Sequence, residues 1–166
     1  EIESELDRYI DIFKRLQAEQ KMDELKNRLE KLVQHKDKLD RDIDNLEISN
    51  DTSTETRIWQ EEQRGLEELN SINQDIQEAS ELIKPFSEKS ATKLDKLKNS
   101  PDFNQAENNI EETISSLQQN NSKKAKTSSQ STINNLNNIQ KQLTNIQQEF
   151  QNETVSEMAE KLEKIM

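Results

Sequence analysis

The chain has 166 residues and a formal net charge of −11; 34% of the residues are charged, 29% are hydrophobic, and there are one Gly, two Pro and no Cys. Because sheets need tight turns, which draw on Gly and Pro, this composition predicts an all-α protein. The absence of Cys excludes disulfides and thiolate chemistry, and the negative charge disfavours nucleic acid and anionic membranes as partners.

Residues 1–48 are predicted to form one long helix with two apolar stripes of heptad spacing. The first stripe holds Ile2, Leu6, Tyr9, Phe13 and Leu16. The second holds Met22, Leu25, Leu29, Leu32, Leu39, Ile43 and Leu46. The two stripes are out of phase. Because residues 16–22 contain no Gly or Pro, we expect a local change of winding there and no break.

Residues 49–54, SNDTST, are predicted to interrupt the helix, since such side chains bond to nearby backbone and favour caps. Asp51 suits the start of a second helix over about 54–84. Its stripe is Trp59, Leu66, Leu69, Ile72, Ile76, Ala79 and Ile83. Pro85 should end it, because proline disfavours helical geometry in the preceding residue.

A third helical region is predicted from Phe86 to Leu117, with an interruption at residues 99–103, where Pro101 can take the first helical position. Residues 118–131 form the most polar stretch and are predicted to be a loop. The last helix is expected over about 129–166. Its apolar residues are Leu136, Ile139, Leu143, Ile146 and Phe150, followed after a phase slip by Val155, Met158, Leu162 and Ile165.

Each predicted helix must bury its stripe against another helix. Residues 52–166 are predicted to close a three-helix bundle as one domain, anchored by Trp59, and residues 1–48 to form a separate coiled-coil helix. The expected bundle core is Trp59, Leu66, Leu69, Phe103, Ile110, Leu143, Ile146 and Phe150. The helix over 1–48 then has no partner in the bundle, which predicts a two-fold homodimer through Leu25, Leu29, Leu32, Leu39 and Ile43.

The sequence offers no persuasive site for chemistry. Asp40, Asp42 and Asp44 match the first three ligand positions of a calcium loop, but the loop's Gly and Glu positions hold Asn45 and Asp51. A solvated helix face explains these aspartates. His35 is the only histidine, one Gly cannot build a phosphate loop, and the basic cluster KKAK at 123–126 is read as a solvated loop. We therefore expect no catalytic residue, no cofactor and no metal, and a protein that is not an enzyme.

The stretch TRIWQEEQRGLEEL, residues 56–69, places a Trp before charged residues and then leucines. In this it resembles the first helix of a spectrin repeat, and residues 52–166 have the length of one repeat. Within that family the acidic, Asn/Gln/Lys-rich chain is similar to the rod of a protist α-actinin. The resemblance implies an antiparallel dimer in the cytoplasm, on the cytoskeleton, that contacts actin only through domains outside this segment.

One further indication bears on function. The chain begins with Glu1 and not Met, which indicates a segment of a longer protein. The leading prediction is a structural rod that dimerises and separates terminal binding domains, as in an actin cross-linker. The alternative is a coiled-coil tether or scaffold module of a trafficking or kinetochore-type complex, which should form parallel or heteromeric coils. A secreted helical effector or translocator should instead carry an apolar membrane-inserting segment.

Overall fold

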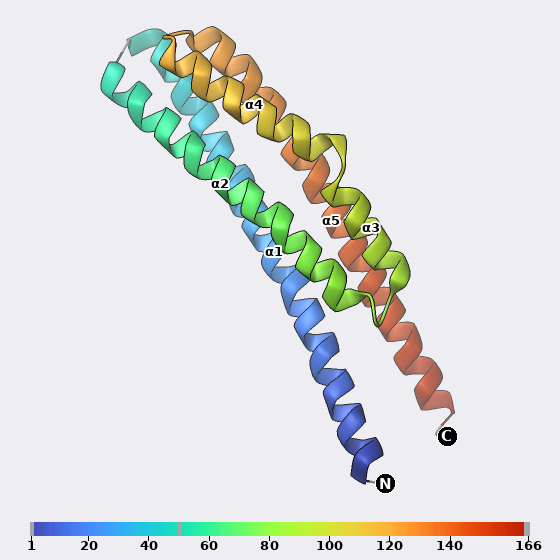
Figure 1. The fold of residues 1–166 in the computed structure, drawn as a ribbon. Helices are drawn as coiled ribbons and strands as arrows, with labels where there is room; N and C mark the ends of the chain where they lie inside the picture. Colours follow the sequence, from blue (N-terminus) through green and yellow to red (C-terminus); the bar gives the residue numbers. More distant parts are fainter. Residues whose placement is uncertain (1, 50, 165–166) are drawn as a thin grey trace.

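The computed structural model describes residues 2–49 and 51–164, and this part of the chain forms five helices and no strand (Figure 1). They are α1 (Ile2–Ser49), α2 (Thr52–Ile83), α3 (Glu88–Lys98), α4 (Pro101–Gln118) and α5 (Ser122–Glu163). The predicted all-α class is confirmed. At about 1.5 Å per residue, α1 is roughly 70 Å long. Ile165, predicted on the last stripe, lies outside the described residues.

The helices form an up-and-down bundle of four antiparallel legs, in which α3 and α4 together make the third leg (Figure 1). α1 packs against α2 and α5, α2 against α3 and α4, and both α3 and α4 against α5. Residues of all five helices share one large apolar core. The chain therefore closes a four-helix bundle by itself.

This arrangement corrects the predicted division into a helix over 1–48 and a three-helix bundle over 52–166. From Ala18 to Val33, one side of α1 is buried in the same apolar cluster as residues of the other four helices, and from Leu39 to Leu46 it is buried against α2, α4 and α5. The physical reason is that a stripe of this length finds two neighbours, α2 and α5, within its own chain. Heptad spacing marks which face of a helix must be covered, but it does not say by what.

The predicted ends of the first two helices and the start of α4 agree with the structure to within a few residues, and local chemistry explains them. The side chain of Asp51 caps α2 by accepting hydrogen bonds from Ser53 N at 3.1 Å and Thr54 Oγ1 at 2.6 Å. α2 ends at Ile83, shortly before Pro85. Pro101 stands in the first turn of α4 as predicted, where its missing N–H costs nothing.

The prediction of a loop over residues 118–131 is wrong. Only residues 119–121 separate α4 from α5. Asn120 there has a φ of 56°, the left-handed conformation that Asn tolerates better than most residues, and Asn121 caps α5 by accepting from Lys124 N. The polar residues that follow are helical, and Ser129 and Thr132 are fully buried. Their small side chains fit a tightly packed core. Predicting a loop from polarity alone therefore placed the start of this helix too far along the chain.

A polar layer divides the core into a large and a small apolar cluster. In α1, Lys36 lies between residues of the large cluster and residues of the small one. Glu62 occupies the corresponding place in α2, and Ser129 and Thr132 do so in α5. Trp59 is partly buried and packs against both clusters, so the indole spans the division.

Candidate interaction surface

The residues predicted for the bundle core lie in or against it. Leu69, Phe103, Ile110, Leu143, Ile146 and Phe150 are buried in the large cluster. Trp59 and Leu66 are partly buried and pack against that cluster.

The residues predicted for a dimer seam have their partners inside the single chain, and this assignment is corrected. Leu25, Leu29 and Leu32 belong to the large cluster, and Leu39 and Ile43 belong to the small one. All five are at most 4% exposed. A second copy could reach them only if α1 separated from α2 and α5. While the bundle is folded, these side chains therefore offer no surface to another chain.

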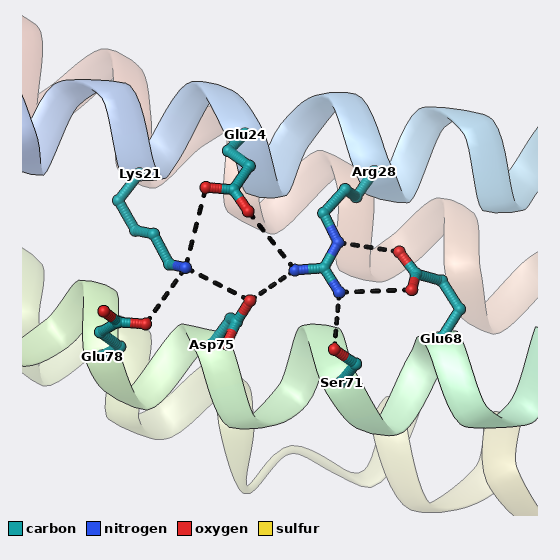
Figure 2. A network of polar contacts seen from close by, with 7 residues as sticks. All are labelled: Lys21, Glu24, Arg28, Glu68, Ser71, Asp75 and Glu78. Atoms are coloured by element: carbon teal, nitrogen blue, oxygen red, sulfur yellow. Dashed lines mark hydrogen bonds and ion pairs between the residues drawn. The ribbon is translucent and has the colours of Figure 1, made fainter.

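A network of charged side chains fixes α1 against α2 (Figure 2). Arg28 Nε and Nη2 donate to the two carboxylate oxygens of Glu68, at 2.8 and 3.3 Å, and Nη1 donates to Asp75 at 2.5 Å. Arg28 Nη2 also donates to Ser71 Oγ at 2.7 Å. Lys21 pairs with Asp75 at 3.3 Å and with Glu78 at 3.1 Å. The forked guanidinium matches a carboxylate at two points, so these contacts fix the register of the helices as well as their spacing.

The network shifts the ionisation of its members. Burial alone would raise the pKa of Asp75, but the hydrogen bonds from Arg28 and Lys21 outweigh it and hold that pKa below its ordinary value. The hydrogen bond to Glu68 contributes most to raising the pKa of Arg28. Both shifts favour the charged forms of Asp75 and Arg28, as their pairing across the two helices requires.

The only ion pair in the described chain with both side chains fully buried is Lys36 with Glu62. The ammonium donates to both carboxylate oxygens, and each side chain has an exposed fraction of 0%. Charges enter a core at a large desolvation cost, which only a close partner offsets. The pair joins α1 to α2 from within and has no access to solvent, so it is not placed to meet a substrate.

The three aspartates of the calcium-like motif are engaged within the fold. Asp40 and Asp44 both accept from Lys126 at 2.6 Å, and Asp42 accepts from Arg57 at 3.0 Å. The aspartates of the calcium-like motif therefore bind cationic side chains of α2 and α5. Among the described residues, no group of three or more His, Cys, Asp or Glu side chains is arranged to hold a metal ion.

The first part of α1 and the last part of α5 extend past the turn between α2 and α3, at the same end of the bundle (Figure 1). Arg15 marks the end of the packed bundle. Its guanidinium donates to Glu157 of α5 at 2.6 Å and lies 4.9 Å from the centre of the Phe86 ring. Every described residue before Arg15 is exposed. We call residues 2–16 of α1 and 155–164 of α5 the projecting end.

The apolar stripe of the projecting end lies on the wrong side of α1 to join the core. The core-facing positions, of which Ala18 is the first, continue backward at heptad spacing to Arg15 and Asp11, which are polar. The apolar stripe ends at Leu16, two residues before Ala18. Two residues turn a helix through about 200°, so the stripe faces away from the core. The phase slip seen in the sequence thus occurs in a continuous helix and divides α1 between two different surfaces.

A second apolar stripe on the projecting end belongs to α5. Val155 and Met158 are exposed by 66% and 51%, and each follows by one position an inward-facing residue, Thr154 or Glu157. Gln147 has the same offset from the core residue Ile146, and it donates to Asp23 of α1. One residue is about 100° of helical turn, so these side chains lie on the side of α5 nearest α1. The exposed stripes of both helices therefore gather at one end of the molecule.

Spacing alone identified both stripes of the projecting end but not their importance. The signal that singles them out is the phase slip in each helix, because a single straight helix cannot present both registers to one core.

Comparison with known proteins adds no assignment: no protein family, curated protein or solved structure matches the chain. None of the helices in the described part of the chain is both long enough and apolar enough to cross a bilayer.

Proposed function

We propose that this protein is a structural element, a helical rod that works through its length and through the apolar surface at its projecting end. The observation that carries the proposal is the distribution of apolar side chains. Between residues 18 and 154 of the described chain, Ile48 is the one large apolar side chain that is exposed, and the other exposed ones lie on residues 2–16 and 155–164. An apolar surface confined to one end marks a place of assembly.

The geometry of the bundle determines which two points such a rod holds at a constant distance, and these are not the two ends of the chain. In one chain, residues 2 and 164 lie at the same end (Figure 1). A four-legged bundle therefore does not hold the two ends of its chain apart. The predicted spacer between terminal domains would require that separation. The distance it fixes is the one between the projecting end and the opposite tip, where α1 meets α2 and α4 meets α5. Rigid helices of roughly 70 Å keep that distance constant.

The actin-related part of the prediction has only the resemblance of residues 56–69 behind it. A cytoskeletal location and a role in actin cross-linking stay predictions. The four-leg arrangement, with its two ends together, differs from the three-helix repeat that the resemblance implies. We therefore restrict the proposal to a rod whose projecting end makes the connection.

A tether that recruits a different protein is the second candidate function, and one observation favours it. The projecting end presents stripes from two helices, α1 and α5, and such a surface suits an amphipathic helix of another protein. The two candidates make different predictions for the purified protein: a tether stays monomeric without its partner.

Small-angle X-ray scattering tests the rod. We expect a maximum dimension of at least about 70 Å, set by α1, together with strongly helical circular dichroism. A single compact particle near the size of an ordinary 166-residue globule, with a radius of gyration of about 15 Å, would contradict the proposed function.

A further inference from the structure

The apolar stripe on residues 2–16 of α1 has the spacing of a coiled-coil seam, and it is exposed to solvent. Its seam residues Ile2, Leu6, Tyr9, Phe13 and Leu16 are exposed by 46% to 84%, and Ile10 and Ile12 flank them with 43% and 48% exposed. We propose that this segment pairs in antiparallel orientation with the same segment of a second copy, so that two bundles join end to end. The inference rests on the proposed function and names the partner that the projecting end takes.

The exposed apolar area is sufficient for a stable dimer. The large apolar side chains of the projecting end include seven on α1 and three on α5, namely Val155, Met158 and Leu162. A large aromatic side chain buries roughly 150–250 Å² and an aliphatic one somewhat less, so the exposed parts of the seven on α1 alone amount to on the order of 700 Å² in each copy. A standard protein interface buries about 800 Å² on each partner. A self-complementary surface of this size can close a two-fold dimer.

The flanking residues favour the antiparallel orientation and fix the register. In a parallel pair, the flanking position of Ile10 would lie opposite Glu5 of the second copy. In an antiparallel pair with position 9 opposite position 13, Ile10 faces Ile10 and Ile12 faces Ile12 of the second copy. The acidic residues Glu3 and Glu5 then fall at the ends of the paired segment, where water reaches them. Only this register covers both flanking isoleucines.

The charge of the segment also suits a second copy. Residues 2–16 carry four acidic side chains, Glu3, Glu5, Asp7 and Asp11, and three basic ones, Arg8, Lys14 and Arg15. Their net charge is close to zero, although the chain as a whole carries −11. Self-association at this end therefore meets less like-charge repulsion than it would elsewhere. A membrane-binding helix needs a predominantly basic polar face, which this segment lacks.

The first experiment measures mass by light scattering coupled to size exclusion. We expect about 39 kDa for the wild type, twice the chain mass of 19.4 kDa. The double variant Tyr9→Glu/Phe13→Glu should be a monomer with unchanged helical circular dichroism, because neither residue packs on the bundle. The matched control is Ile48→Glu at the opposite tip. Ile48 is 87% exposed, and its substitution should leave the dimer intact.

The second experiment determines the relative orientation of the two paired segments, and no native cysteine interferes with it because the chain contains none. One preparation carries Tyr9→Cys and another carries Phe13→Cys. In the antiparallel register, position 9 lies opposite position 13, so a disulfide should form only after the two preparations are mixed. A parallel pair would instead cross-link each preparation with itself, since equal positions then face each other.

Each contrary outcome overturns the inference. A wild type that stays at 19.4 kDa at 100 μM or above has no such interface, and one that then sediments with lipid vesicles uses the stripe for a membrane. A dimer that survives Tyr9→Glu/Phe13→Glu uses another surface. Scattering separates the two proposals: an elongated monomer removes the dimer alone, whereas a compact globule removes the proposed rod.

Discussion

The buried pair of Lys36 and Glu62 allows a sharp test of how the bundle is held together. Each side chain has no exposed surface, and among the residues that the structure describes each is the other's only charged partner. Lys36→Met leaves a carboxylate in the core without a cation, and Glu62→Leu leaves an ammonium without an anion. Either single change should therefore cost about 3–5 kcal/mol of unfolding free energy.

The double variant Lys36→Met/Glu62→Leu should behave differently from either single variant. It replaces both charges by apolar groups of similar size, and such exchanges are often neutral or stabilise by about 1–4 kcal/mol. The double-mutant cycle should then show a coupling of at least about 6 kcal/mol, the two single costs of about 3 kcal/mol or more with nothing lost in the double variant, well above what independent sites give.

Urea unfolding followed by circular dichroism at one protein concentration measures all four corners of this cycle. The matched control is the pair of Arg57 and Asp42, which also joins α1 to α2 but has side chains 45% and 22% exposed. Arg57→Met should cost less than about 1 kcal/mol because water screens the pair. If Lys36→Met lowers the unfolding free energy no more than Arg57→Met does, water reaches the buried pair and the reasoning is wrong.

The remaining predictions concern other parts of the bundle. Gly65 is buried in α2, and a Cβ there would lie 3.7 Å from Leu32 Cδ1, an ordinary contact; Gly65→Ala should therefore stabilise by about 1 kcal/mol in urea titrations. Trp59→Ala should cost about 3 kcal/mol, because the indole packs against both core clusters, and the native fluorescence of this single Trp should be blue-shifted. The folded pKa of Asp75 lies below its unfolded value, so its contribution is present above pH of about 4 and is lost as pH falls through the folded pKa. Acid titration of unfolding free energy should show a smaller loss in Asp75→Asn than in the wild type.

Local chemistry made several features of the fold predictable. Asp51 and Pro85 act on the residues next to them, so the start and end of α2 could be predicted from the sequence. The heptad stripes marked the buried face of each helix, because a helix repeats every 3.6 residues whatever surrounds it. The one local failure was the start of α5. The burial of Ser129 and Thr132 depends on close packing with other helices, which their polarity does not reveal.

The choice of partners for each face was a tertiary decision. The sequence determined that α1 carries two apolar stripes out of phase, and it determined the helices, their caps and the negative charge. Only the folded chain decided that the stripe through Leu25 and Leu32 is covered by α2 and α5, and that the stripe through Tyr9 and Phe13 stays exposed. The reason is that periodicity records the direction in which side chains point along one helix, whereas burial depends on which other helices reach that side.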